Sequence, residues 1–502
     1  MRRILVSLAL ACSACAPSTG AHGVKHVVLI SCDTLRADAL GAYVGSGRDR
    51  LADWGAPPAA ERSPNLDRLA RESVLFERAI AAAPSTLASH ASLFSGLWPN
   101  AHGVARNGFE VRPELETLAE RFAARGFLTA GFAGSFALDR RFGIAQGFAH
   151  WDQEFDLLVD GKAHEQNERR ADKVTDAVLG WFDRTRDDDV PSFVFVHYFD
   201  AHAAYDPPGR APDVVGERSV SGSMDDLRAA VDGHQRELGD PRGLDATILS
   251  GLDPRWIGRE VQAGELDRAL VSRYAGEVRW LDGEIERLLR GLDERGILRD
   301  ALVIVTADHG ETLVDHCDVY NHGLALYQST VHVPLLVRLP DGTGAGRRVA
   351  STVSNVDVLP TLLALCDLPA GAPVDGVSLL DALEGRPFAR GPVFSTATQP
   401  PSVEVPGAWL GLSKAQGVQS DAFQWIESPY LGRRELYDLA ADPEQRHDLS
   451  EDGSERVRRA REELSRALDA WRLSSRPLPS SFDRSQVEEV ERRLRELGYT
   501  GR

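Results

Sequence analysis

The chain has 502 residues, enough for two or three domains, and its 43% hydrophobic residues are typical of a globular protein with a large core. Its 57 basic and 75 acidic residues give a net charge of −18. This acidic balance argues against a protein that binds nucleic acid, because such proteins normally present a basic face.

The N-terminal segment, residues 1–20, reads MRRILVSLALACSACAPSTG and has the pattern of a bacterial secretory leader. Its apolar run is too short to span a bilayer, and no later segment is apolar enough to do so. The sequences ending at Cys12 and Cys15 resemble lipid-attachment sites. We therefore expect an outer-membrane lipoprotein held by an N-terminal lipid or, after simple cleavage, a secreted or periplasmic protein. The other cysteines, at 32, 317 and 366, do not form a disulfide framework.

Strand-like and helix-like segments alternate along the first part of the chain. Residues 115–122 share a helical face that ends at Gly126, and residues 277–292 share another that ends before Gly296. This alternation predicts an α/β fold with a large, mostly parallel sheet flanked by helices. The apolar runs expected to form its strands lie at 27–30, 127–134, 192–200 and 301–311.

The composition and the hydrophobic pattern of the sequence change along the chain and divide it into parts. We assign residues 22–395 to a catalytic domain with an insertion, rich in Gly, Asp and Arg, at about 207–270. Residues 396–475 are expected to form a smaller α+β subdomain with short antiparallel strands, followed by an amphipathic helix at 455–471. Residues 476–502 have the helical spacing and alternating charge of a helical tail.

Aspartates follow three of the predicted strands, at Asp33, Asp200 and Asp308. Ligands of open α/β sheets bind beyond the carboxyl ends of the strands, so these residues predict one site assembled from distant segments. The alternative is structural, since an Asp after a strand is often a helix N-cap and Asp308-His309-Gly310 alone can be a turn.

Asp33, Asp308 and His309 can converge on a divalent cation. Two carboxylates and an imidazole suit zinc or manganese better than calcium, which prefers oxygen ligands only, and calcium stays as an alternative. Thr86, in the stretch PSTLASHASLFSG, is the candidate fourth ligand and nucleophile, because a metal lowers the pKa of a bound hydroxyl. It would lie near the N-terminus of a helix beginning around Leu87, whose positive dipole end favours an anionic substrate.

A series of motifs runs along most of the chain, namely LISCDTLRADALG, SPNLDRLARESVLFERAIAAAPSTLASHASLFSGLWPNAHGV, VHYFDAHAAYDPP, VIVTADHGETL, HGLALYQSTVHVPLLV, SNVDVLPTLLAL, VDGVSLL and ELYDLAADPEQRHDL. Through these motifs the chain resembles, from about residue 24 to 450, the sulfatase branch of the alkaline phosphatase superfamily. The resemblance implies an alkaline phosphatase-like sandwich and a metal-dependent ester hydrolase.

The chain departs from the sulfatase signature at its first position. Sulfatases have a Cys or Ser there that is oxidised to formylglycine, whereas this chain has Thr86, with Ala88 at the Pro position and His90 at the Arg position. Thr followed by His resembles instead the nucleotide pyrophosphatase/phosphodiesterase branch, where threonine attacks phosphorus. The segment AGSFALDRRFG also lacks the Lys and His that neutralise sulfate in sulfatases. Both departures favour a phosphate ester as the substrate. The resemblance also implies that His90 is a catalytic residue.

The second half of the site follows from the same resemblance. Asp200, His202 and His322 are expected to contact the substrate oxyanion or to form a looser second metal site, and His322 can protonate the leaving group. Glu311 is expected to orient His309. Structural roles are expected for four further residues in family-like segments, His197, Arg36, Asp38 and His102.

The sequence therefore predicts a hydrolase that cleaves a phosphate or sulfate ester of a small molecule, lipid or glycan through Thr86, with phosphate mono- and diesters favoured. Three alternatives stay open. One is sulfatase activity through the unmodified threonine. The second is a phosphotransferase in which a lipid or glycan alcohol resolves the phosphorylated Thr86. The third is a degenerate binding protein, against which the intact set of metal-binding residues argues.

Overall fold

The structure of the chain is a computed structural model. The predicted leader at 1–20 and most of the predicted insertion at 207–270 lie outside the residues that it describes. No helix in the described part has both the length and the apolar character needed to cross a membrane. The described residues are 21–45, 47–155, 157–159, 162–164, 166–185, 190–203, 205–208, 263–313, 315–316, 321–369, 371–399, 414–474 and 487–497.

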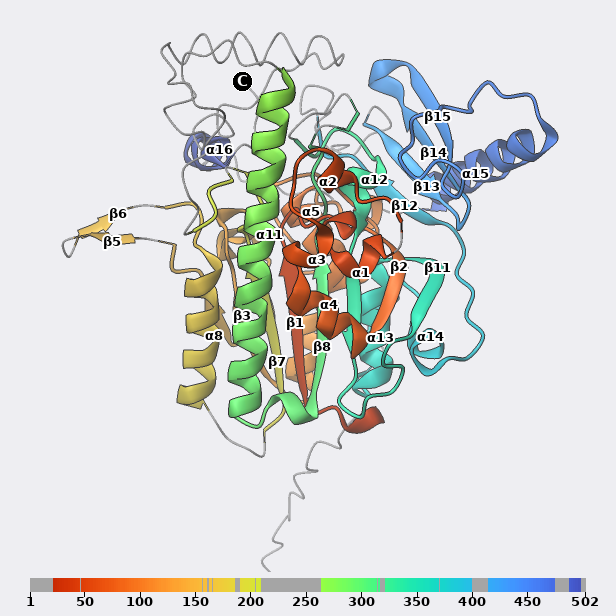
Figure 1. Cartoon of the computed structure of the whole chain (residues 1–502). Helices are drawn as coiled ribbons and strands as arrows, with labels where there is room; N and C mark the ends of the chain where they lie inside the picture. The colour runs from red at the N-terminus through yellow and green to blue at the C-terminus, as the bar shows by residue number, and fades with distance from the viewer. Residues whose placement is uncertain are drawn as a thin grey trace, which may run out of the picture.

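A large sheet forms the centre of the molecule, with its strands in the order β11-β2-β10-β8-β1-β7-β3-β4 and β9 paired to β2 (Figure 1). Only β10 and β9 pair with their neighbours in the antiparallel direction. The predicted α/β fold with a mostly parallel sheet is confirmed. The strands of this sheet are β1 (His26–Cys32), β2 (Val74–Ile80), β3 (Leu128–Phe132), β4 (His150–Asp152), β7 (Ser192–Tyr198), β8 (Ala301–Ala307), β9 (His332–Val333), β10 (Leu335–Arg338) and β11 (Arg348–Ser354).

The central strands β1, β7 and β8 are buried at every residue, as continuous apolar runs predict for strands covered on both faces. Helices α4, α8 and α11 lie in front of the sheet in Figure 1. Helix α5 contacts both α7 and α13, and the three form the second layer. The main helices are α4 (Pro64–Arg71), α5 (Thr86–Ser95), α7 (Leu118–Ala124), α8 (Ala171–Thr185), α11 (Ala263–Glu294) and α13 (Val358–Leu365).

Shorter elements complete this part of the chain. A two-stranded ribbon, β5 and β6, extends away from the main sheet (Figure 1). Single helical turns connect the longer elements. The short elements are β5 (Leu157–Val159), β6 (Lys162–His164), α1 (Gly41–Val44), α2 (Arg50–Asp53), α3 (Ala59–Arg62), α6 (Pro99–His102), α12 (Gln328–Val331) and α14 (Leu380–Glu384).

Two helices show how local sequence signals set their ends. Helix α7 begins with a capping box, in which Thr117 accepts a hydrogen bond from the Glu120 N–H and the Glu120 side chain accepts one from the Thr117 N–H. Helix α11 begins at Ala263, inside the range predicted as an insertion, because the apolar face predicted for 277–292 continues toward its N-terminus through buried side chains such as Val271.

The C-terminal subdomain is a four-stranded antiparallel sheet with α15 packed on β13 and β14. Its first strand begins at Val393, a few residues before the predicted boundary at 396, because β12 pairs with β13 rather than with the main sheet. The elements are β12 (Val393–Thr396), β13 (Gln416–Gln419), β14 (Phe423–Ser428), β15 (Arg433–Asp438) and α15 (Glu455–Ser474).

The helical tail contains α16 (Val487–Glu496), which packs on the main domain. Val490 and Leu494 join the main hydrophobic core, and the guanidinium of Arg493 lies 3.9 Å from the ring centroid of Phe136. The same guanidinium donates to Oδ1 of Asn167. The tail is therefore a docked helix beside the loop that follows β3.

Replacing Leu494 by Ala should destabilise the protein by about 2–5 kcal/mol, because the side chain is 1% exposed and its loss leaves a cavity. Urea unfolding at constant pH measures the change. Leu473→Ala is the matched control, since that leucine is 88% exposed, and it should stay within about 0.5 kcal/mol of the wild type. Equal destabilisation by the two substitutions would contradict the docking of α16.

Candidate active site

The ends of three parallel strands bring the candidate residues to one edge of the sheet. Cys32, the last residue of β1, lies beside Tyr198 of β7 and Ala307 of β8. Asp33 and Asp308 follow directly, so they emerge next to each other at the carboxyl edge, where ligands bind in open α/β sheets.

Asp33, Asp308 and His309 offer donor atoms to a common point. These atoms lie within 4.8 Å of one another, and all three side chains are buried. Nε2 of His309 lies 3.7 Å from Oδ1 of Asp33 and 3.6 Å from Oδ2 of Asp308. Within the described part of the chain, none of these three atoms has a hydrogen bond. A divalent cation would satisfy all of them, so the residues fit a metal.

Electrostatics also favours a cation at this point. Burial raises the pKa of the Asp33 carboxyl and that of the Asp308 carboxyl, and the charge of Asp33 raises the pKa of Asp308 further. Two buried carboxylates this close repel each other unless a positive charge stands between them. His309 is oriented to bind such a cation as a neutral ligand, because its Nδ1 donates to the Gly310 carbonyl at 2.9 Å. In the neutral ring the Nε2 lone pair then faces the two carboxylates, as in a metal-ligating imidazole.

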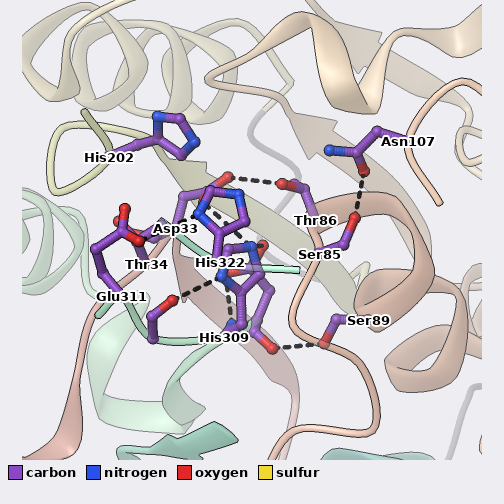
Figure 2. A network of polar contacts seen from close by, with 12 residues as sticks. Asp33, Thr34, Ser85, Thr86, Ser89, Asn107, His202, His309, Glu311 and His322 are labelled. Atoms are coloured by element: carbon purple, nitrogen blue, oxygen red, sulfur yellow. Dashed lines mark hydrogen bonds and ion pairs between the residues drawn. The ribbon is translucent and has the colours of Figure 1, made fainter. Parts of the chain in front are cut away.

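Thr86 is the first residue of α5 and is fully buried. Its hydroxyl donates to Oδ2 of Asp33 at 3.2 Å, which places the oxygen next to the metal-binding group (Figure 2). The preceding N-cap residue, Ser85, makes no side-chain hydrogen bond to the helix. The positive end of the helix dipole is therefore directed at the place where an anionic substrate would meet Thr86.

Asn107 completes this end of the site, although the sequence did not point to it. Its Oδ1 accepts hydrogen bonds from the Leu87 N–H at 2.8 Å and from the Ser85 hydroxyl at 3.0 Å. These bonds turn Nδ2 toward the space over Thr86 (Figure 2). Nδ2 is buried and has no hydrogen-bond acceptor among the residues that the structure describes. The only local signal is the Asn107-Gly108 dipeptide, which predicts a turn and gives no hint of a site.

His90 is positioned behind the site instead of facing a substrate. Its Nδ1 donates to the Thr86 carbonyl at 2.7 Å, and its Nε2 pairs with the Ser31 hydroxyl at 2.9 Å. Burial lowers the pKa of His90 to about 4, so the ring is neutral near pH 7. His90, His197 and Asp308 form a second close donor group, but both nitrogens of His90 are already used, so this group does not fit a metal.

His202 and His322 face the reacting centre from the side opposite Thr86 (Figure 2), with ring centroids 5.1 Å apart. Burial lowers the pKa of His202 to about 3. Its Nδ1 donates to the Ala203 carbonyl at 2.6 Å, so Nε2 of the neutral ring carries a lone pair.

Glu311 does not orient His309, although the sequence predicted that it would. Nδ1 of His309 bonds the Gly310 carbonyl oxygen, whereas the Glu311 carboxyl contacts Nδ1 of His322 at 3.4 Å. The prediction is therefore corrected, and Glu311 orients His322.

The structure does not bring Asp200 together with His202 and His322 as a second metal set. Neither close donor group in the described residues includes Asp200. Its Oδ1 lies 3.7 Å from Arg170, and burial raises the pKa of the Asp200 carboxyl to about 6. The spacing of Asp200 and His202 in the sequence suggested a shared site, but their side chains enter different networks.

Arg36, Asp38 and His102 have the structural contacts that were expected of them. Arg36 is paired with Asp38 and Asp315, and its Nη1 also donates to the Glu311 carbonyl, which ties the end of β1 to the segment after β8. It does not pair with an aspartate of the metal-binding group. His102 bonds the Ser92 hydroxyl of α5 and the Val104 N–H.

Comparisons with known proteins find relatives along most of the chain. The family model described as Sulfatase matches residues 25–368, and that described as N-sulphoglucosamine sulphohydrolase, C-terminal, matches residues 318–473. An arylsulfatase of Clostridium perfringens is 25% identical over 496 residues, covering 88% of this chain and 94% of that protein. An N-acetylglucosamine-6-O-sulfatase of Bacteroides thetaiotaomicron is 22% identical over 446 residues, covering 77% of this chain and 78% of that protein. The solved phosphonate monoester hydrolase of Agrobacterium radiobacter shares the fold, with a TM-score of 0.66, 22% identity, and 89% and 96% of the two chains covered.

Adding a divalent cation to chelator-treated protein should raise its melting temperature, because a cation held by Asp33, Asp308 and His309 would stabilise the folded state. Saturation at 100 times the dissociation constant corresponds to about 2.7 kcal/mol. Asp308→Asn should abolish most of the shift. Asp200→Asn, a buried acid outside the donor group, is the matched control and should keep it. An unchanged shift in Asp308→Asn would exclude this metal site.

Proposed function

Because the chain belongs to the sulfatase family, we propose that it is a divalent-metal-dependent ester hydrolase whose nucleophile is the hydroxyl of Thr86. The substrates favoured are phosphate mono- and diesters. The observation that carries the proposal is the position of Thr86 at the first residue of α5, with its hydroxyl 3.2 Å from Asp33 Oδ2 beside the metal-binding group. Membership of the family by itself supports ester hydrolysis, and Thr86 at the nucleophile position supports attack by a threonine hydroxyl on a phosphate ester.

The first step forms a bond between Thr86 Oγ1 and the phosphorus. The hydroxyl proton passes to Asp33 Oδ2, the atom that already accepts its hydrogen bond. A divalent cation held by Asp33, Asp308 and His309 supplies Lewis-acid polarisation and lowers the pKa of a hydroxyl beside it. The bond from phosphorus to the ester oxygen breaks in the same step.

Charge that develops on the non-bridging oxygens is stabilised from the side of α5. Asn107 Nδ2 donates to one of these oxygens, and the positive end of the helix dipole lies behind it. Because Oδ1 of Asn107 is held by two donors, the amide needs no reorganisation when the charge develops.

The leaving oxygen takes a proton from His322. Burial raises the pKa of Glu311 to about 8, so near neutral pH a proton is held between Glu311 and His322, 3.4 Å apart. In the second step water attacks phosphorus and breaks its bond to Thr86. His322, which gave up a proton in the first step, takes one proton of that water, Nε2 of His202 accepts a hydrogen bond from it, and Thr86 recovers its own proton from Asp33.

The preference for phosphate follows because a threonine ester, unlike a formylglycine ester, cannot collapse by itself to release the bound group. A formylglycine hydrate carries a second hydroxyl on the same carbon, which lets a sulfated intermediate collapse. Thr86 has one hydroxyl, so its ester is released only by attack of water at the central atom, and that attack is easier at phosphorus than at sulfur. A sulfate ester is the second candidate substrate, because relatives of similar length are named sulfatases.

The donor set gives an order of metals. With two oxygen ligands and one nitrogen ligand, zinc and manganese are favoured over calcium, which prefers a shell of oxygens. Activity restored to metal-free protein by each of these ions in turn, with magnesium included, tests this order.

Thr86→Ala should lower kcat on aryl phosphate or aryl phosphodiester by about 10³-fold or more, because the nucleophile is gone. Thr86→Ser keeps the hydroxyl and should retain measurable turnover. Intact-protein mass after mixing with a slow phosphate substrate should show a phosphoryl group on the wild type and none on Thr86→Ala.

The same assay ranks the alternatives. Sulfate turnover above phosphate turnover would overturn the phosphate preference, and full activity of Thr86→Ala would remove the nucleophile. Faster product formation when a lipid or glycan alcohol is added would identify a phosphotransferase. Tight anion binding without turnover of any ester would identify a binding protein.

Asn107→Asp should lower kcat by about 10²- to 10³-fold, because it removes the donor Nδ2 and places a charge against the substrate. It keeps the oxygen that accepts from Leu87 and Ser85, so α5 stays capped. The melting temperature of the variant, measured in parallel, separates loss of the donor from loss of the cap. Wild-type kcat in Asn107→Asp would rule out contact between this amide and the reacting group.

A further inference from the structure

Asn355 is a buried amide beside α5, and the reaction described above does not use it. It is the first residue of the helical turn Asn355–Asp357 that follows β11, and this turn contacts α5. Its Oδ1 accepts a hydrogen bond from the Ala82 N–H at 3.1 Å. A main-chain N–H can only donate, so the amide oxygen must face Ala82. The Nδ2 group is therefore left to face α5.

The Nδ2 group of Asn355 binds Ser89, a fully buried residue of α5. It donates to the Ser89 hydroxyl oxygen at 2.8 Å and lies 3.2 Å from the Ser89 carbonyl oxygen, which also accepts from it. Because the Ser89 hydroxyl accepts this bond, its own proton is directed to the carbonyl oxygen of Asp308, 2.6 Å away (Figure 2). A chain of hydrogen bonds thus runs from Asn355 through Ser89 to the main chain of a metal-binding residue.

This chain of hydrogen bonds encloses the segment that carries Thr86. Ala82 lies four residues before Thr86 and Ser89 lies three residues after it, and Asn355 is bonded to both. Residues three apart on a helix lie on the same face, so Thr86 and Ser89 share the side of α5 that meets the end of β8. The bond from Ser89 to the Asp308 carbonyl therefore joins the turn of helix that starts at Thr86 to the metal-binding group.

We propose that Ser89 and Asn355 are positioning residues, which together fix the Thr86 hydroxyl relative to the metal-binding group. They act through the main chain of α5 and of Asp308 and not by contact with a substrate. Without the Ser89 hydroxyl, α5 and the end of β8 can shift against each other, and a misplacement of about 1 Å can lower a rate about 100-fold. This inference rests on the proposed function for the role of Thr86, but not for the role of Asp308 in binding a metal.

The test compares Ser89→Ala with Ser95→Ala, its matched control on the same helix. Ser95 is also buried, and its hydroxyl donates to the Ala91 carbonyl at the same distance of 2.6 Å, but it does not bond Asp308. We expect Ser89→Ala to lower kcat on aryl phosphate about 10-fold or more, with KM within about twofold. Metal binding, measured by competition with a chromogenic chelator, should weaken about 10-fold. Ser95→Ala should keep kcat and metal affinity within about twofold of the wild type, although its melting temperature falls by a similar amount.

Asn355→Asp tests the other end of the chain of hydrogen bonds. The aspartate keeps an oxygen for the Ala82 N–H, but the atom facing Ser89 becomes an acceptor that draws the hydroxyl proton away from Asp308. We expect kcat and metal affinity to fall in the same direction as in Ser89→Ala. The double variant should lose much less than the product of the two single losses, because both substitutions break the same connection.

Two results would overturn the proposal: kcat and metal affinity of Ser89→Ala within twofold of the wild type, or equal losses in Ser89→Ala and Ser95→Ala. Losses that multiply in the double variant would reject the part of Asn355. If Ser89→Ala does not fold, Asn355→Asp decides by the same two measurements. The metal measurement also keeps this inference separate from the proposed function. Weaker metal binding by Ser89→Ala in a protein inactive on every ester would retain the role of Ser89 toward Asp308 and reject only the proposed reaction.

Discussion

Two carboxylates buried side by side constrain the whole active site. Asp33 and Asp308 follow adjacent parallel strands, so the register of β1 against β8 fixes their separation. Both are buried, and each carries an oxygen without a hydrogen bond in the described part of the chain. Such a pair is stable as two anions only beside a cation, and Nε2 of His309 lies within 3.7 Å of both carboxylates. A divalent cation at this point would neutralise the two charges.

The chain bends sharply directly after Asp33 to reach this arrangement. Thr34 adopts a positive φ of 54°, which is strained for a β-branched residue. The hydroxyl of Tyr274 on α11 donates to the Thr34 carbonyl and accepts from the Arg36 N–H, so it bridges the turn. A helix of the front layer therefore holds the strained residue that follows Asp33.

Much of the fold was readable from the sequence because it depends on patterns within one segment. The apolar runs predicted β1, β7 and β8, and helical spacing predicted α7, the C-terminal half of α11, α15 and α16. The meeting of Asp33 with Asp308 followed from the rule that ligands bind at the carboxyl ends of strands. Contacts between residues far apart in the sequence could not be predicted in this way. The spacing in the tail predicted a helix, but Arg493 contacts Phe136, more than 300 residues earlier, and nothing in either segment names the other.

Four side chains of the site share one physical feature, because each is oriented by a main-chain group. A carbonyl of Gly310 orients His309, a carbonyl of Ala203 orients His202, the N–H of Leu87 orients Asn107 and the N–H of Gly134 orients His197. Every residue except proline has these groups, so no motif marks them. The sequence therefore shows which chemical groups are present, while the backbone path decides which atom of each group faces the substrate. For Asn107, the backbone path directs Nδ2 toward the space over Thr86 (Figure 2), although the sequence indicated only a turn there.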